Sequence, residues 1–133
     1  MNRSRPILIA EDDVNDRYLL NKAFTEMLQP GRLQFAYNGI ELFKYLDGIA
    51  NEAELPCLIV LDINMPSLDG ITALEILKSN ERYKNIPVVM FTADQNPFEK
   101  TRCLEIGAKD YLIKPLSYAE TKVAVRLLCA LSV

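Results

Sequence analysis

Five consecutive apolar residues, Cys57 to Leu61, run directly into Asp62. An uninterrupted apolar run of this length predicts a strand that is buried on both faces, as in a parallel sheet covered by helices. A carboxylate at the end of such a strand is costly to bury unless another group pairs with it. Asp62 therefore predicts a partner that the neighbouring residues do not provide.

Three other strand-like segments also run into polar groups. These segments and the groups that follow them are Pro6–Ala10 before Glu11, Asp12 and Asp13, Pro87–Phe91 before Thr92, and Tyr111–Ile113 before Lys114 and Pro115. The carboxyl ends of parallel strands line one edge of an open sheet, and ligands bind at that edge. We therefore expect the acid cluster, Asp62, Thr92 and Lys114 to meet there.

Helix-like segments alternate with the strands. Apolar periodicity and helix-end signals predict a half-exposed strand over Leu33–Tyr37 and helices over Val14–Leu28, Ile40–Leu46, Ile71–Lys78, Asn96–Gly107 and Ser117 to about Leu131. Five strand–helix repeats predict an α/β fold with a doubly wound, five-stranded parallel sheet and helices on both faces. The first, third and fourth strands are apolar throughout and should be central, which gives the flavodoxin-like order 2-1-3-4-5. The acid cluster and Asp62 then lie at the switch point of the sheet.

The same patterns predict helix ends and buried faces. Pro30-Gly31 should end the first helix, and Asp13, Asp69, Asn96 and Ser117 are candidate N-caps. The second helix should bury Ile40, Phe43 and Leu46, and the last should bury Ala124, Leu127, Leu128 and Leu131. The opposite side of the last helix then carries Lys122, Val125, Arg126, Cys129 and Val133. Because this side is unusually apolar for an exposed face, we expect it to bind a partner together with the fifth strand.

Length and composition exclude several classes of function. A chain of 133 residues predicts a single domain, 1–133, and the stretch after Lys114 has room for one helix but no output domain. A formal charge of −3 without a Lys/Arg cluster argues against nucleic-acid binding. No apolar run approaches the roughly 20 residues of a membrane span. The cysteines are odd in number and widely spaced, which indicates reduced thiols in a cytoplasmic protein; they are Cys57, Cys103 and Cys129.

The chain has no histidine, which excludes a Ser-His or Cys-His nucleophile and a His-ligated zinc site. Three carboxylates as close as Glu11, Asp12 and Asp62 would resist ionising together unless a cation neutralised them. Mg²⁺ is the expected cation, because it takes one or two carboxylates, water and phosphate. The backbone carbonyl of Asn64 is a further candidate ligand. Lys114 can then grip a phosphoryl oxygen as a point charge.

Five motifs occur in order: Ile7–Asp13, Val60–Gly70, Pro87–Ala93, Gly107–Tyr111 and Leu112–Pro115. Together they resemble the receiver domain of two-component response regulators over essentially the whole chain. The resemblance is to single-domain receivers of the chemotaxis-regulator kind.

The resemblance implies that Asp62 accepts a phosphoryl group from a phosphohistidine on a sensor histidine kinase or a histidine phosphotransfer protein. It also implies that Glu11, Asp12, Asp62 and Asn64 hold Mg²⁺, and that Thr92 and Lys114 bind the phosphoryl oxygens. Thr92 and Tyr111 match the family's switch pair, and Lys114-Pro115 matches its cis peptide. Such a domain catalyses only its own phosphorylation and dephosphorylation, and signals to a downstream protein or a weak homodimer.

Three alternatives compete with this interpretation. An aspartyl-phosphate phosphatase or phosphotransferase carries an Asp-x-Asp motif after its first strand. Here the strand-end Asp62 is on the third strand, and Asn64 stands in place of the second Asp. A nucleotide or flavin module needs a phosphate-binding loop, whereas the loop after the first strand is acidic. A pseudo-receiver would bind a partner without being phosphorylated, and the presence of the acid pair, Asp62, Thr92 and Lys114 argues against it. For single residues, Asp13 is better explained as a helix cap, and Tyr111 is either a switch or a half-buried edge aromatic.

Overall fold

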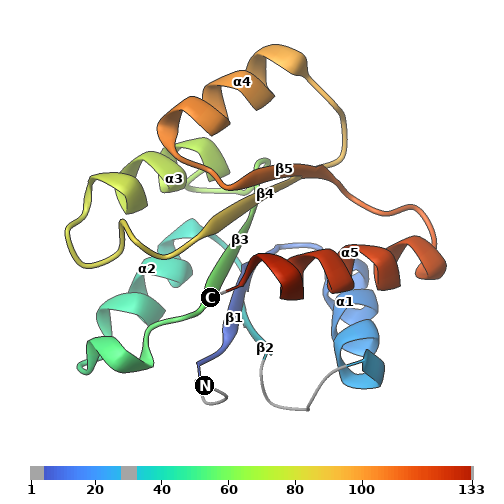
Figure 1. Cartoon of the computed structure of the whole chain (residues 1–133), viewed down its shortest axis with the longest axis horizontal. Coiled ribbons are helices and arrows are strands. Elements are labelled where there is room, and N and C mark those ends of the chain that lie inside the picture. Colours follow the sequence, from blue (N-terminus) through green and yellow to red (C-terminus); the bar gives the residue numbers. More distant parts are fainter. Residues whose placement is uncertain (1–4, 28–32, 133) are drawn as a thin grey trace.

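The computed structural model describes residues 5–27 and 33–132. Its centre is a five-stranded parallel sheet with the order β2-β1-β3-β4-β5, as predicted (Figure 1). The strands are β1 (Ile7–Ala10), β2 (Leu33–Ala36), β3 (Leu58–Asp62), β4 (Val88–Thr92) and β5 (Asp110–Ile113). Every residue of β1, β3 and β4 is buried, which confirms that these three strands are central.

Five α-helices follow the strands in turn: α1 (Val14–Met27), α2 (Gly39–Asp47), α3 (Gly70–Ser79), α4 (Pro97–Ile106) and α5 (Tyr118–Leu131). A short 3-10 helix, Glu52–Glu54, lies in the predicted loop before β3. The predicted end of the first helix at Leu28 and Pro30-Gly31 lies outside the described residues. No helix in the described part of the chain is long and apolar enough to cross a membrane.

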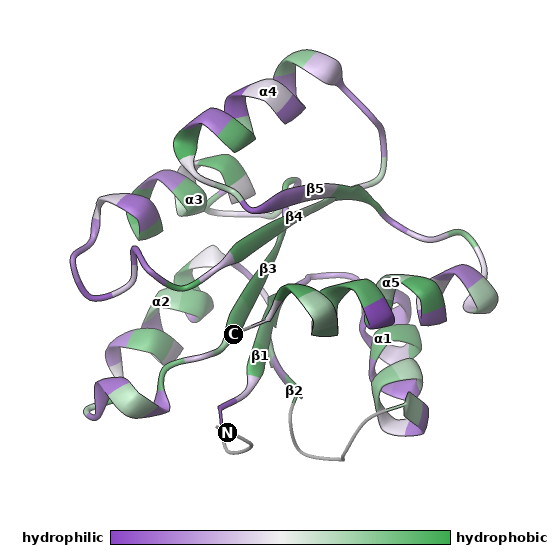
Figure 2. Cartoon of the chain, viewed as in Figure 1, coloured by the Kyte–Doolittle hydropathy of each residue, from purple (hydrophilic) through white to green (hydrophobic). Residues whose placement is uncertain are grey.

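The sheet separates two hydrophobic cores. One contains buried residues of α2, α3 and α4, and the other contains those of α1 and α5 (Figure 1). In Figure 2 the central strands are hydrophobic, whereas the helices carry both hydrophilic and hydrophobic residues. This pattern is the expected one for strands covered on both faces by amphipathic helices.

Strand register brings the polar strand ends to one edge. Ala10 pairs with Leu61, Asp62 with Phe91, and Thr92 with Ile113. The residue after β1 is therefore level with the end of β3, and the residue after β5 follows the end of β4. This register places the acid cluster, Asp62, Thr92 and Lys114 along the same edge of the sheet.

Polar side chains begin several helices at this edge. Asp13 accepts a hydrogen bond from the Asp16 amide, Asp69 from the Thr72 amide and Ser117 from the Glu120 amide. Asn96 accepts from the amides of Phe98 and Glu99 at the start of α4. These contacts confirm the predicted caps, and such a cap typically stabilises a helix by about 1 kcal/mol.

Two glycines allow close backbone packing around the loop after β3. A Cβ atom on Gly70 would lie 2.4 Å from the carbonyl oxygen of Asp62. A Cβ atom on Gly39 would lie 2.7 Å from the Cβ atom of Leu68. Both distances are too short for any side chain, so these glycines let α2 and α3 start against the segment that carries Asp62.

The predicted buried face of the last helix was only partly right. Leu128 is buried and Ala124 and Leu131 pack against the core as predicted, whereas Leu127 is exposed. The other buried residues of α5 are Thr121 and Val125. Apolar residues surround most of this helix, so their spacing alone allows more than one orientation. The hydroxyl of Thr121 donates to the Ser117 carbonyl oxygen at 2.9 Å, which satisfies it inside the core. A count of apolar residues therefore missed Thr121 as an inward position.

Two smaller predictions also needed correction. Ile40 is 49% exposed, and the inward positions of α2 are Gly39, Leu42 and Leu46. This helix begins at the tightly packed Gly39, which turns Ile40 outward.

The described residues contain no cis peptide, so the bond before Pro115 is trans, in contrast to the predicted cis bond. Trans is the favoured isomer of a bond before proline in the absence of other constraints.

The orientation of α5 predicts opposite outcomes for two identical substitutions. Val125→Glu puts a carboxylate at a position that is fully buried, and should lower the free energy of unfolding by about 4 kcal/mol. Val123→Glu, at a position that is 60% exposed, should change it by less than about 0.5 kcal/mol. Urea unfolding followed by circular dichroism measures both. Equal losses in the two variants would contradict this orientation of the helix.

Candidate functional site

Three carboxylates converge where β1 and β3 end. One oxygen from each of Glu11, Asp12 and Asp62 lies within 4.8 Å of the others. Glu11 and Asp62 are buried and Asp12 is exposed. The predicted acid cluster is therefore assembled as a site with one side open to solvent. Asp13 caps α1 instead, in agreement with the interpretation favoured for it.

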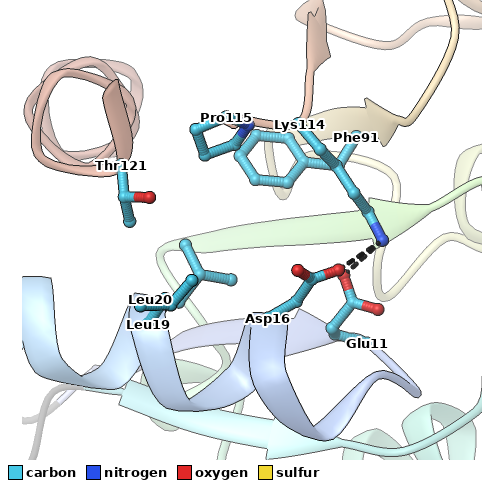
Figure 3. Close-up of a pocket in the computed structure, with 8 residues that line it drawn as sticks. All are labelled: Glu11, Asp16, Leu19, Leu20, Phe91, Lys114, Pro115 and Thr121. Carbon is cyan, nitrogen blue, oxygen red and sulfur yellow. Dashed lines mark hydrogen bonds and ion pairs between the residues drawn. The ribbon is translucent and has the colours of Figure 1, made fainter. Parts of the chain in front are cut away.

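The ammonium group of Lys114 lies among three carboxylates. Its Nζ atom is 2.7 Å from Glu11 Oε1, 2.9 Å from Asp62 Oδ2 and 3.1 Å from Asp16 Oδ2. Figure 3 shows the lysine reaching from the end of β5 towards Glu11 and Asp16. This is the partner that the sequence predicted for Asp62. An ammonium has three hydrogen-bond donors, and these three acceptors can use all of them.

Asp16 was not among the predicted site residues. It lies in the first turn of α1, which starts directly after the acid cluster. The sequence did contain a usable signal, because a helix that begins at the ligand-binding edge carries its first turn close to the site. Its carboxylate is also favourably placed near a helix N-terminus.

Burial and charge perturb the two central ionisable groups. Burial is the main reason that the pKa of Glu11 is raised to about 7, and the nearby Asp62 charge adds to it, against the lowering effect of Lys114. For Lys114, burial lowers the pKa, but hydrogen bonds to Glu11 and Asp62 outweigh it and leave the pKa above its usual range. Lys114 therefore stays charged, while Glu11 titrates near neutral pH.

Both oxygens of Asp62 have donors. The backbone amide of Asn64 donates to Oδ1 at 3.1 Å, and Lys114 donates to Oδ2. The loop itself is fixed by a hydrogen bond from the Ile63 amide to the Phe91 carbonyl and one from the Gly70 amide to the Ile63 carbonyl. Asn64 is thus beside the carboxylate as predicted, through its amide. Its carbonyl as a metal ligand stays a prediction.

The hydroxyl groups of the two predicted switch residues form hydrogen bonds to groups other than Lys114. The hydroxyl of Thr92 is buried at the end of β4 and donates to the Asp94 carbonyl at 3.0 Å. Tyr111 is buried in the core on the α4 side, and its hydroxyl donates to Glu99 Oε1 at 2.8 Å. Burial and the bond to Glu99 raise the pKa of Tyr111. Tyr111 is therefore not a half-buried edge residue, and its role as a switch stays a prediction.

Comparison with known proteins identifies the class that this fold and site represent. The family model of the response regulator receiver domain matches residues 7–126. The chain is 32% identical over 122 residues to the probable methanogenesis regulatory protein FilR2 of Methanothrix harundinacea. This match covers 90% of this chain and 77% of that protein. It is 36% identical over 123 residues to the peroxide stress-activated histidine kinase mak2 of Schizosaccharomyces pombe, a match that covers 90% of this chain and 5% of that protein.

Solved structures of response regulators support the same assignment. The phosphorylated cyanobacterial phytochrome response regulator RcpA has a TM-score of 0.81 at 27% identity, with 92% of this chain and 89% of that chain covered. The Mn²⁺-bound response regulator Rcp1 has a TM-score of 0.77 at 27% identity, with the same coverage. The protein belongs to the response regulator receiver family, and is thus a domain of two-component signalling.

The raised pKa of Glu11 predicts a pH dependence of stability in metal-free protein. Glu11 holds its proton more tightly in the folded chain, where its pKa is about 7, than at the ordinary value of 4.5. Its contribution to the free energy of unfolding is therefore fully present below about pH 4.5 and is lost as the pH rises through about 7. Glu11→Gln should lack this decline, whereas Glu105→Gln, at an exposed position, should keep it.

Urea midpoints measured from pH 4 to 8 in the presence of chelator test this expectation. This range includes both pKa values and extends about one pH unit above the higher one, where the titration is nearly complete. The informative quantity is the difference between the wild-type and Glu11→Gln curves. A difference that does not change with pH would show that the pKa of Glu11 is the same in the folded and the unfolded chain, and would contradict this expectation.

Proposed function

We propose that Asp62 accepts a phosphoryl group from a phosphohistidine of a sensor histidine kinase or a histidine phosphotransfer protein. The observation that carries this proposal is the setting of Asp62, a buried carboxylate whose oxygens contact Lys114 and the Asn64 amide beside the acid pair. In the transfer, a bond forms between a carboxylate oxygen of Asp62 and phosphorus, and the bond between the donor nitrogen and phosphorus breaks. The chain itself catalyses only the gain and loss of its own phosphoryl group.

Positioning and charge neutralisation are the main requirements of phosphoryl transfer. Lys114 already lies 2.9 Å from the acceptor carboxylate, so a small change directs one of its donors to a phosphoryl oxygen. Thr92 ends the neighbouring strand, and its hydroxyl can become a second donor if it leaves Asp94. Both groups supply donors without a general base, which agrees with the absence of histidine from the chain.

A divalent cation fits the acid cluster. The carboxylates of Glu11, Asp12 and Asp62 supply oxygen ligands within 4.8 Å of one another, which is the ligand chemistry that Mg²⁺ prefers. We propose that these residues and the Asn64 carbonyl hold Mg²⁺. Bound there, the ion neutralises charge on the carboxylates and on the phosphoryl oxygens. The similar response regulator Rcp1 has been solved in a Mn²⁺-bound form, which supports the binding of a divalent cation by a receiver of this kind.

We further propose that the receiver acts as a stand-alone cytoplasmic regulator, and that Thr92 and Tyr111 relay the state of Asp62. The hydroxyls of these residues contact Asp94, which precedes α4, and Glu99, which lies within it. Movement of Thr92 towards a phosphoryl group breaks its bond to Asp94, and so affects the segment that leads into α4. The mass of the native polypeptide in cell extracts tests whether the receiver is stand-alone, because further domains would make the polypeptide larger than this chain.

The output surface is proposed at the last helix and the edge strand β5. We propose a different side of α5 from the one predicted, because Val125, a residue of the predicted surface, is buried. Exposed Ile113, Val123 and Leu127 line a groove between β5 and α5. A groove with exposed apolar side chains suits a downstream protein or a weak homodimer.

Phosphorylation should occur once, at Asp62. With acetyl phosphate and Mg²⁺, intact-mass spectrometry should show one added phosphoryl group, and Asp62→Asn or a chelator should abolish it. Asp69→Asn is the matched control, because Asp69 caps α3 on the same loop and asparagine caps a helix equally well. Labelling of the Asp62→Asn variant at the wild-type level would refute the proposal.

The output surface should be separable from phosphorylation. Val123→Glu combined with Leu127→Glu should leave labelling of Asp62 intact and reduce association of the phosphorylated form by at least about tenfold, because two charges enter an apolar contact. Ile76→Glu is the control, at a position on α3 that is 42% exposed. Sedimentation with beryllofluoride, an acyl-phosphate mimic, measures self-association, and a pull-down measures partner binding. Unchanged association in both assays would place the output surface elsewhere.

A further inference from the structure

Asp16 is the contact of Lys114 to which the proposed phosphoryl transfer gives no role. It lies in the first turn of α1, with its Oδ2 atom 3.1 Å from Lys114 Nζ (Figure 3). Its side chain is 38% exposed, compared with 1% for Glu11 and 5% for Asp62. It is also absent from the set of three carboxylates that converge within 4.8 Å. Asp16 therefore approaches the ammonium from outside the acid cluster.

The other two acceptors of Lys114 have competing duties. In the proposed function, Glu11 and Asp62 are ligands of the cation, and Asp62 also carries the phosphoryl group. Each therefore directs oxygens away from Lys114 once the site is filled. Asp16 has no such duty, so its contact with the ammonium can persist in every state of the site.

Packing around the lysine side chain is incomplete. A cavity of about 20 Å³ lies beside Lys114, lined by residues that include Leu20, Phe91 and Thr121. Fewer atoms contact the stem of a lysine on the side of a void, so packing constrains it less there. Polar contacts at the ammonium therefore contribute to holding it towards the carboxyl edge of the sheet.

We propose that Asp16 is a positioning residue that keeps the Lys114 ammonium directed at the phosphoryl site when Glu11 and Asp62 are otherwise engaged. This inference rests on the proposed function of Asp62. Asp16 does not touch the reacting atoms, and it acts only through Lys114. The competing explanation is structural, since an aspartate in the first turn stabilises a helix whatever its contacts.

Binding of beryllofluoride in saturating Mg²⁺ tests the inference, with ¹⁹F NMR to detect the bound form and calorimetry to measure affinity. Asp16→Ala removes the acceptor and should weaken beryllofluoride binding about fivefold, as expected for loss of a partly exposed charge pair. Asp16→Asn keeps an oxygen acceptor and should fall between Asp16→Ala and the wild type. Asp13→Asn is the matched control, because it removes a charge from the same helix start and preserves the cap without reaching Lys114.

A purely structural role would lower the melting temperature of Asp16→Ala and leave beryllofluoride affinity equal to that of Asp13→Asn, which would overturn the inference. Tighter binding by Asp16→Ala would also overturn it, because Asp16 would then compete with the phosphoryl group for Lys114. If Asp16→Ala does not fold, the comparison of Asp16→Asn with Asp13→Asn decides the question. Failure of the wild type to bind beryllofluoride would instead refute the proposed function.

Discussion

The ion cluster around Lys114 is the interaction on which the site depends. One ammonium contacts three carboxylates, which lie directly after β1, at the end of β3 and in α1, and two of these carboxylates are buried. Lys114 extends from the end of β5, and β4 lies between β5 and β3 in the sheet. Neighbouring strands are about 4.8 Å apart, so only a long side chain can span two of them. Loss of this cation would leave buried carboxylates unpaired, which is far more costly than loss of an exposed ion pair.

The backbone around Asp62 is fixed as firmly as its side chain. The Gly70 amide bonds the Ile63 carbonyl, and Gly70 itself packs too closely on the Asp62 carbonyl to carry a side chain. The start of α3 therefore sets the position of Asp62. On the other side, the Ile63 amide bonds the Phe91 carbonyl, which ties the loop after Asp62 to β4 and so to Thr92. A change at Asp62 can pass to β4 through these contacts without loss of the sheet.

The sequence was sufficient for the sheet order and for the convergence of Glu11, Asp12, Asp62 and Lys114, because strand burial and strand-end chemistry are both local patterns. It was insufficient where a polar residue is satisfied inside the core. Thr121 is buried with its hydroxyl bonded to the Ser117 carbonyl, and the expected buried face of α5 omitted it and Val125 while it included the exposed Leu127. Asp16 was missed for a related reason, since its importance comes from a lysine 98 positions away.

The charge of the site also constrains the order in which it can be filled. Glu11, Asp16 and Asp62 contact a single ammonium, and Asp12 lies beside Glu11 and Asp62. Burial is the main cause of the raised pKa of Glu11, and the nearby charge of Asp62 adds to it. A phosphoryl group brings further negative charge to the same point. If Asp62 is the acceptor, as proposed, it can accept this group readily only after the carboxylates are neutralised, either by protonation of Glu11 or by a cation. Because protonation of Glu11 would also remove one of the proposed metal ligands, a bound cation would be the route that leaves Asp62 and its neighbours ionised and able to react.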